Sequence, residues 1–166
     1  WRQGRTVYGG LTSGLALAAT RLAFPDLPPL RSAQINFIGP VTEDPVITPI
    51  LLRQGRNVTS VRTDMHCAGN LVATVVFIFG SSRESHVSAT LAAPEAPSPD
   101  DCELFTPPQF EKFVPKFFLR FDTRLIAGGR PASGKTDGYI RAWARHKNPD
   151  SRDGAVSFLT LGDVLP

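Results

Sequence analysis

The segment from Gly129 to Thr136 carries residue types whose spacing could bind nucleotide phosphates. It reads GRPASGKT and matches the pattern G-x-x-x-x-G-K-[ST] at every required position. In a phosphate-binding loop, backbone N–H groups would hold the phosphates, Lys135 would reach the terminal ones and Thr136 would hold a magnesium ion. This chemistry requires a loop that leaves a buried parallel strand and enters a helix directly.

The residues after this motif favour a hairpin instead. Asp137 and Gly138 form a turn signal, and residues 139–145 then alternate between two faces, which is typical of a strand. The stretch SFLTLGD, residues 157–163, could imitate an apolar strand that ends in a magnesium-binding Asp. Few residues remain after Thr136 for a nucleotide-binding domain, so we interpret the glycines as turn residues and keep nucleotide binding as the alternative.

Other chemistry-bearing side chains do not form a recognisable metal or cofactor site. Two cysteines, Cys67 and Cys102, lack the close spacing of metal ligands, and His66, His86 and His146 are isolated in the sequence. We interpret the cysteines as reduced thiols of a cytoplasmic protein and expect no metal and no cofactor.

The charge and hydropathy patterns also exclude two classes of partner. The net charge is +3, from 18 Lys and Arg against 15 Asp and Glu, and the basic residues are spread too evenly to predict nucleic-acid binding. No apolar run approaches the ~20 residues that a membrane-spanning helix requires. We therefore expect a soluble, folded protein with neither nucleic acid nor a membrane as its partner.

The elements that would position these side chains begin with a helix. In residues 11–24 the apolar residues recur at helical spacing, and Pro25 ends the pattern. Small residues such as Gly14 and Ala16 would allow close approach of other backbone, which favours a helix buried against a sheet. Gly9 and Gly10 are expected just before its first turn.

A strand meander is predicted after this helix. Residues 30–37 alternate between apolar and polar, and residues 46–52 and 58–65 read as two strands joined at Gln54-Gly55. Residues 71–80 are apolar on both faces, so we expect a central strand that is well covered. A helix followed by strands with short turns cannot form a doubly wound parallel sheet. The sequence therefore predicts an α+β fold in which an antiparallel sheet curls over one long helix.

The second half is predicted to start the same arrangement again. A proline-rich stretch, residues 91–108, reads as a linker. After it come two expected strands, KFFLRFDTRLI and GYIRAWARH, and the opening of a helix in GAVSFLTLGDVL. Because no strands follow that helix, we expect that residues are missing from the quoted chain or that another chain completes this half.

Four motifs in the same order resemble the thioesterase II-type acyl-CoA thioesterases, the double-hotdog group. They are YGGLTSGLALAA, LRSAQINFIGPV, LLRQGRNVTSVRTDM and LVATVVFIFGSSR, and the later pieces FDTRLIAGGRP, GYIRAWARHK and LTLGDVLP resemble the start of the second hotdog. The resemblance implies a first hotdog domain at 1–90, a linker at 91–108 and the first part of a second hotdog domain at 109–166. It also implies that the double units associate into a homo-oligomer.

The resemblance implies hydrolysis of the thioester of acyl-CoA, the expected substrate. In this family an Asp on the second hotdog helix works with a hydroxyl and an amide residue to activate water, and the motif LGDVLP places that Asp at Asp163. From the residues alone, the favoured interpretation of Asp163 is a helix residue that satisfies local backbone donors or faces solvent, and the resemblance favours the catalytic role instead. A carboxylate partly buried among apolar side chains is suited to general-base work. The hydroxyl and amide partners are expected in later strands, and Thr160 is not assigned to either role.

Four further residues are predicted to bind substrate. Backbone N–H groups at the helix start after Gly9 and Gly10 could stabilise an oxyanion, although close packing explains the glycines equally well. Arg53 and Arg56 could meet the phosphates of coenzyme A, or could only brace the turn around Gly55. The functional alternative is a non-catalytic acyl-CoA-binding hotdog protein. A hotdog dehydratase is disfavoured because no histidine lies on a predicted helix.

Overall fold

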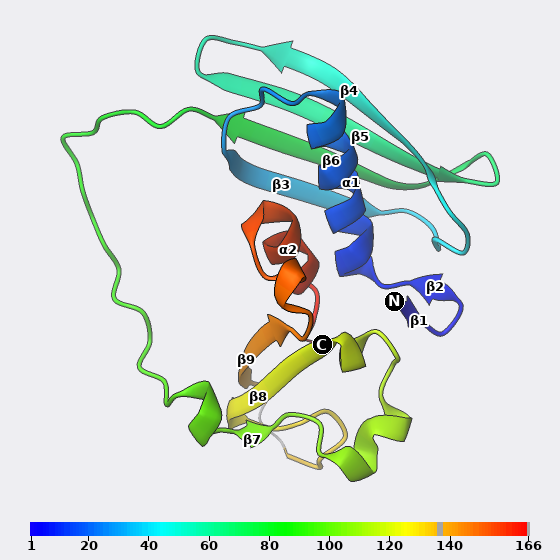
Figure 1. The fold of residues 1–166 in the computed structure, drawn as a ribbon, viewed down its shortest axis with the longest axis vertical. Helices are drawn as coiled ribbons and strands as arrows, with labels where there is room; N and C mark the ends of the chain where they lie inside the picture. The colour runs from blue at the N-terminus through cyan, green and yellow to red at the C-terminus, as the bar shows by residue number, and fades with distance from the viewer. Residues whose placement is uncertain (136–137, 166) are drawn as a thin grey trace.

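Two lobes meet at a pair of helices in the computed structural model, which describes residues 1–135 and 138–165 (Figure 1). The larger lobe is a four-stranded sheet and the smaller one a three-stranded sheet, and α2 lies between them, packed against α1. In chain order the elements are β1 (Arg2–Gln3), β2 (Thr6–Val7), α1 (Gly9–Ala23), β3 (Leu30–Phe37), β4 (Val46–Gln54), β5 (Val58–Cys67), β6 (Asn70–Gly80), η1 (Pro99–Asp101), β7 (Glu103–Leu104), η2 (Pro108–Phe113), η3 (Phe118–Arg120), β8 (Phe121–Gly128), β9 (Ile140–His146), η4 (Pro149–Ser151) and α2 (Gly154–Leu161).

The larger sheet has the strand order β3-β6-β5-β4, and every neighbouring pair is antiparallel. Alternate side chains of the two central strands point toward α1 and are fully buried, among them Val61, Met65, Val75 and Phe77. The predicted antiparallel sheet over a long helix is confirmed. Pro49 lies in β4 at the sheet edge, where a missing N–H is tolerated.

Strand β6 differs from its prediction in one respect. It is central, as expected, but only the face toward α1 is buried, because Thr74, Val76 and Ile78 on the opposite face remain partly exposed. Apolar residues on both faces of a strand therefore do not require two covering layers within the described chain.

Helix α1 begins two residues earlier than predicted and buries a different face. Gly9 and Gly10 lie in its first turn, because the Thr12 N–H donates to the Tyr8 carbonyl and makes Tyr8 the N-cap. The apolar stripe at helical spacing is largely outside, with Leu15 and Leu22 exposed, and the helix buries a polar and small-residue face instead: Gly10, Thr12, Ser13, Gly14, Ala16, Leu17 and Thr20.

Burying hydroxyl groups on α1 is possible because each one has a partner within the helix. Thr12 Oγ1 donates to Tyr8 O, Ser13 Oγ to Gly9 O and Thr20 Oγ1 to Ala16 O at 2.7 Å. A buried polar group that is hydrogen-bonded avoids most of its desolvation cost. Small residues on this face also allow close approach of α2, which contacts α1 near Gly10 and Gly14.

Residues 81–120, hereafter the connecting segment, join the two lobes. Its first part, residues 81–98, is exposed and has no helix or strand, and runs along one side of the molecule in Figure 1. Its later part is folded: β7 pairs with β8, and Phe105 and Phe117 are buried with Phe121 in a second core cluster. The end of the predicted linker thus belongs to the core of the smaller lobe, while the domain boundaries at 90 and 108 stay a prediction.

The smaller lobe follows the predicted order of two strands and a helix. Strands β8 and β9 form an antiparallel hairpin, and α2 begins eight residues after β9. The predicted strand from Lys116 starts later than expected, because residues 118–120 form a single 3-10 turn before β8. This turn places the aromatic side chains of Phe117 and Phe118 in the core rather than along a strand.

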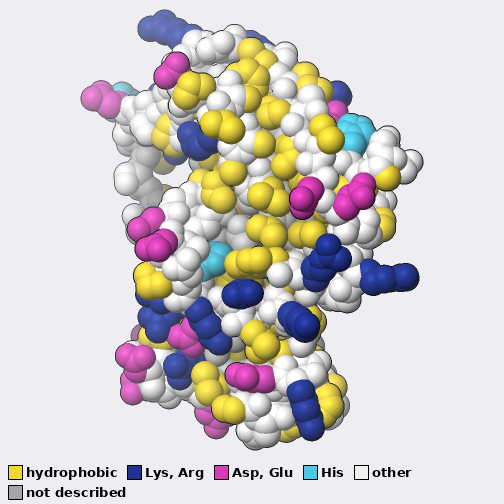
Figure 2. Space-filling view, turned by 45° about the vertical axis from the view of Figure 1, so that its right-hand side comes forward, with side chains coloured by type: hydrophobic (Ala, Val, Ile, Leu, Met, Phe, Trp, Pro, Cys, Tyr) yellow, Lys and Arg dark blue, Asp and Glu magenta, His cyan; other side chains and the backbone are white. Residues whose placement is uncertain are grey.

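Apolar side chains also reach the surface of the larger lobe. Leu22 on α1 is 87% exposed and Val46 on β4 is 68% exposed. Figure 2 shows apolar side chains spread over the upper part of one face, with Lys and Arg side chains gathered around its middle and lower parts. The expected homo-oligomer stays a prediction. Within the described residues, no helix is both long and apolar enough to cross a membrane.

Candidate active site

The first turn of α1 meets the end of α2 at the point where the two lobes join. Three of the five predicted site residues come together here: Gly9, Gly10 and Asp163. Asp163 was expected on the helix but lies two residues beyond α2, which ends at Leu161. The N-terminus of a helix presents N–H groups and a positive dipole end, so it favours a carboxylate in this place.

The Asp163 carboxylate is held by one backbone hydrogen bond. The Gly10 N–H donates to Asp163 Oδ2 at 3.1 Å. Partial burial raises the pKa of Asp163 above its ordinary value, while the hydrogen bond from Gly10 opposes that shift. A carboxylate of this kind holds a proton more readily than a solvated one, which suits a general base.

Glycine permits close contacts at both positions beside this carboxylate. A Cβ on Gly9 would lie 2.6 Å from Asp163 Oδ2 and 2.9 Å from the ring of Phe37. A Cβ on Gly10 would collide with the backbone carbonyl of Thr160 and with the Tyr8 ring. The two glycines therefore allow the close approach of α1 to α2 and to Asp163. The same glycines thus serve both the helix packing and the binding of the carboxylate.

Tyr8 supports the same junction and was missed in the sequence analysis. Its hydroxyl donates to the Thr160 carbonyl at 2.7 Å, and its ring stacks on Phe117 with centroids 4.1 Å apart. Burial, and then the nearby charge of Asp163, raises the pKa of Tyr8 above its ordinary value, so the hydroxyl stays protonated and remains a donor. The feature of the sequence that could have pointed to Tyr8 is its position immediately before Gly9 and Gly10.

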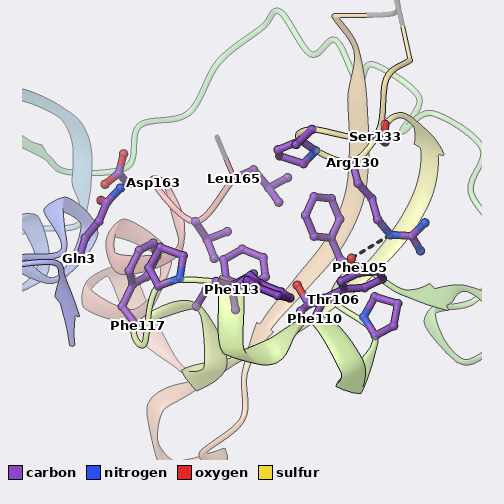
Figure 3. Close-up of a pocket in the computed structure, with 17 residues that line it drawn as sticks. Gln3, Phe105, Thr106, Phe110, Phe113, Phe117, Arg130, Ser133, Asp163 and Leu165 are labelled. Atoms are coloured by element: carbon purple, nitrogen blue, oxygen red, sulfur yellow. Dashed lines mark hydrogen bonds between the residues drawn. The ribbon is translucent and has the colours of Figure 1, made fainter.

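Asp163 opens onto a pocket of about 680 Å³ (Figure 3). Figure 3 shows Asp163 and Gln3 at one end, Arg130 and Ser133 at the other, and aromatic rings between them. Most of the wall comes from the connecting segment, of which residues 91–108 were predicted only as a linker and residues 109–120 as the start of the second hotdog domain. The recurrence of Phe through FTPPQFEKFVPKFF was the signal that could have revealed it.

Arg53 and Arg56 lie at the other end of the larger sheet from Asp163. Both are exposed and flank the turn between β4 and β5. That turn is beside the end of β6, whereas Gly9 contacts Phe37, whose partner Ala73 is near the start of β6. The structure does not bring the two arginines together with Asp163, and their role in binding substrate stays a prediction.

The motif resembling a phosphate-binding loop connects two antiparallel strands. It lies between β8 and β9, and the residues that follow it form a strand rather than a helix. Gly128 and Gly134 have φ values of 88° and 73°, which explains glycine at these turn positions. Lys135 Nζ donates to the Gly128 carbonyl at 3.2 Å, whereas Thr136 lies outside the described residues. The hairpin interpretation is confirmed, and the strand-loop-helix geometry of a nucleotide site does not occur here.

The cysteines and histidines do not gather around this site. Cys67 and Cys102 are free and buried. His146 is buried, with Nε2 3.2 Å from the Ser157 carbonyl. Within residues 1–135 and 138–165, His, Cys, Asp and Glu form no cluster of three or more that could hold a metal ion.

Comparison with protein families gives a match to one part of the chain. Residues 1–80 match the family described as the acyl-CoA thioesterase N-terminal domain. No curated protein sequence matches the chain.

Comparison with solved structures extends the likeness over both lobes. A hotdog-fold protein of unknown function from Alicyclobacillus acidocaldarius superimposes with a TM-score of 0.84 at 24% identity, over 100% of this chain and 61% of its own. The acyl-CoA thioesterase II TesB2 of Mycobacterium marinum gives 0.69 at 22% identity, over 95% and 59%. The tesB protein of Mycobacterium avium subspecies paratuberculosis gives 0.72 at 18% identity, over 99% and 60%.

The chain thus spans about three fifths of the length of these structures, and at this identity the likeness concerns the fold. Residues 1–80 are thus similar to the acyl-CoA thioesterase N-terminal domain family, and the described chain has the α+β hotdog fold.

Proposed function

We propose that this protein hydrolyses acyl-CoA thioesters to a free acid and coenzyme A, with Asp163 as the residue that orients and activates water. The observation that carries the proposal is the position of the carboxylate. Asp163 is held against the N-terminus of α1 by Gly10 and faces an apolar pocket at the junction of the two lobes.

The geometry supports a general-base mechanism. Asp163 Oδ2 accepts the Gly10 N–H, and the second carboxylate oxygen is available to accept a hydrogen bond from water. As the water oxygen attacks the thioester carbonyl carbon, its proton passes to the carboxylate. The tetrahedral intermediate then collapses, the C–S bond breaks, and the departing thiolate takes up the proton.

The oxyanion of the intermediate requires hydrogen-bond donors that point at it. Because the Gly10 N–H is used by Asp163, the donors left at this helix start are the neighbouring N–H groups of Gly9 and Leu11, for which the described residues offer no acceptor. We assign them to the oxyanion. The resemblance adds a hydroxyl and an amide residue from strands that would follow α2.

The experiment is to measure thiol release by the full-length protein from a panel of acyl-CoA esters. Asp163→Asn keeps the shape of the side chain but removes the base, and should lower the rate by about 10²–10⁴-fold. Asp153→Asn is the matched control, because Asp153 is exposed, precedes α2 and makes no capping hydrogen bond with its side chain.

Each outcome distinguishes the proposal from its alternative. A selective loss in Asp163→Asn supports both the reaction and the residue, whereas full activity in that variant would place the base elsewhere. If the wild-type protein binds acyl-CoA but releases no thiol at any chain length, the non-catalytic acyl-CoA-binding function replaces the proposed one.

A further inference from the structure

The side chains of β9 alternate between the core of the smaller lobe and an opposite, outer face. Ile140, Ala142 and Ala144 pack against the second core cluster, whereas Arg141 and Trp143 point the other way. Guanidinium and indole groups donate hydrogen bonds and accept none. The outer face of β9 therefore offers two donor-only side chains that are two residues apart.

Residues 93–99 of the connecting segment are restricted to an extended conformation by their prolines. They read APEAPSP. Proline fixes its own φ at about −65°, and a residue that precedes proline is pushed into the β or polyproline II region. Ser98 has φ −58° and ψ 144°, which is polyproline II geometry. This conformation has no internal hydrogen bonds, so its carbonyl groups need partners from elsewhere.

The outer face of β9 supplies hydrogen-bond partners for these carbonyl groups. Trp143 Nε1 donates to the Pro97 carbonyl at 3.0 Å. Arg141 donates to the carbonyls of Pro94 and Glu95. The connecting segment comes down one side of the molecule and joins the smaller lobe at η1, directly after these residues (Figure 1).

The spacing of the donors on β9 matches the spacing of the carbonyl acceptors. Arg141 and Trp143 are separated along the strand by about 6.6 Å, at ~3.3 Å per residue. Glu95 and Pro97 are separated by about 6.2 Å in polyproline II, at ~3.1 Å per residue. A strand and a polyproline II segment that run in the same direction can therefore keep both hydrogen bonds at once.

We propose that the outer face of β9 is a docking surface for a proline-rich segment in the polyproline II conformation, and that residues 94–97 of this chain occupy it. Trp143 and Arg141 recognise the carbonyl groups of that segment. The connecting segment is then a docked strap between the lobes and not only a covalent tether. The inference goes beyond the proposed reaction, because neither Trp143 nor Arg141 lines the pocket beside Asp163.

Polyproline II docking explains this contact better than the addition of a strand to the sheet. Pro94 and Pro97 have no N–H group to donate to a neighbouring strand. The hydrogen bonds run from side chains of β9 to main-chain carbonyls, whereas a strand pair would join two main chains. Recognition of proline-rich segments by aromatic side chains is a general mode of peptide binding.

A protease that cleaves after glutamate tests the docking, because the connecting segment contains a target inside the docked part and another outside it. Glu95 lies between the two docked prolines, whereas Glu84 lies where the described residues show only a local hydrogen-bonded turn at Ser85 and Val87. In the full-length protein, cleavage after Glu95 should be about tenfold slower than in a synthetic peptide of residues 81–100. Cleavage after Glu84 should proceed at the rate seen in the peptide.

Substitutions on β9 test which side chain holds the strap. Trp143→Phe keeps an aromatic ring and removes the donor, so it should speed cleavage after Glu95 about fivefold, the effect of one hydrogen bond. Arg145→Gln is the matched control, because Arg145 lies on the same face of β9 but pairs with Asp122. It should leave the cleavage after Glu95 unchanged.

A second measurement asks whether the surface recognises the segment itself. In a variant with both Pro94→Gly and Pro97→Gly, the indole N–H resonance of Trp143 should move, as followed by two-dimensional NMR. Both prolines are exposed, so the lobes are expected to stay folded. Adding the peptide APEAPSP should return the resonance toward its wild-type position, whereas the same peptide with glycine in place of each proline should not.

Four results would overturn the inference. They are equal protection of Glu84 and Glu95, an unchanged Glu95 rate in Trp143→Phe, a glycine peptide that binds as well as the proline peptide, and protection that increases with protein concentration. The last result would assign the surface to a strap from another copy of the chain. None of these readouts depends on thiol release, so the proposed function is tested separately.

Discussion

Adding one methyl group at Gly14 should destabilise the contact between α1 and α2 that positions Asp163. A Cβ built on Gly14 would lie less than 3.0 Å from Thr160 Oγ1, closer than real Cβ atoms approach. Its next neighbours, the carbonyl oxygen and Cγ1 of Val156, would be at ordinary contact distances of 3.5 and 3.6 Å. A single hydroxyl oxygen therefore accounts for the collision.

Two terms of opposite sign set the size of the effect. Overpacking a close contact costs about 1–3 kcal/mol. Alanine is favoured over glycine within a helix by roughly 0.5–1 kcal/mol. Gly14→Ala should thus lower the free energy of unfolding by about 0.5–2 kcal/mol. In a Thr160→Ala background the collision is absent, so the same substitution should stabilise the protein by about 0.5–1 kcal/mol.

The assay is urea unfolding of the four proteins of this double-mutant cycle. Ala18→Gly serves as a calibration of the helix term, because Ala18 is exposed in the same helix. The expected coupling energy is about 1–3 kcal/mol, equal to the overpacking term. If Gly14→Ala has the same effect in both backgrounds, the close packing of α1 on Thr160 is wrong.

Two further predictions concern the groups around Asp163. The rate of thiol release should rise with pH and level off once Asp163 is ionised. The pH of the half-maximal rate should lie above the ordinary Asp pKa of about 3.9, because burial raises the pKa of this carboxyl. A rate that does not change with pH below that value, in protein that is still folded, would contradict the assignment. Tyr8→Phe should lower the free energy of unfolding by about 1–2 kcal/mol, because the buried Thr160 carbonyl loses the donor at 2.7 Å while the stacking on Phe117 is kept. An unchanged urea midpoint would show that this hydrogen bond contributes nothing.

The order of the elements could be predicted from local patterns. Alternation in β3, the Gln54-Gly55 turn and the proline-rich stretch at residues 91–108 each reflect a property of a few neighbouring residues. The same applies to the motif at Gly129, where the turn residues after Lys135 and the alternation through Trp143 indicated a hairpin rather than a strand-loop-helix unit.

The face that α1 buries could not be predicted from periodicity. Leu15 and Leu22 are more hydrophobic than Thr12 and Thr20, yet the threonines are buried. Hydropathy ranks side chains by the free energy of their transfer from water and takes no account of hydrogen bonds made in the fold. Thr12 and Thr20 donate to carbonyls in the preceding turn, and Thr20 Oγ1 also lies 2.6 Å from Thr63 Oγ1 on β5. Satisfied hydroxyls therefore let this face of α1 pack on the sheet, and Gly10 and Gly14 permit the close approach of α2.

From the sequence by itself we could predict the class of fold and, through the resemblance, the candidate base Asp163. The sequence also showed the pair Gly9 and Gly10 near the start of the first helix. Only the tertiary structure joined Gly9 and Gly10 to Asp163, more than 150 residues away, because α1 approaches α2 closely where its own residues carry no Cβ. It also separated Arg53 and Arg56 from that site and brought the connecting segment into the pocket wall. Such contacts depend on how distant segments pack, and no local pattern records them.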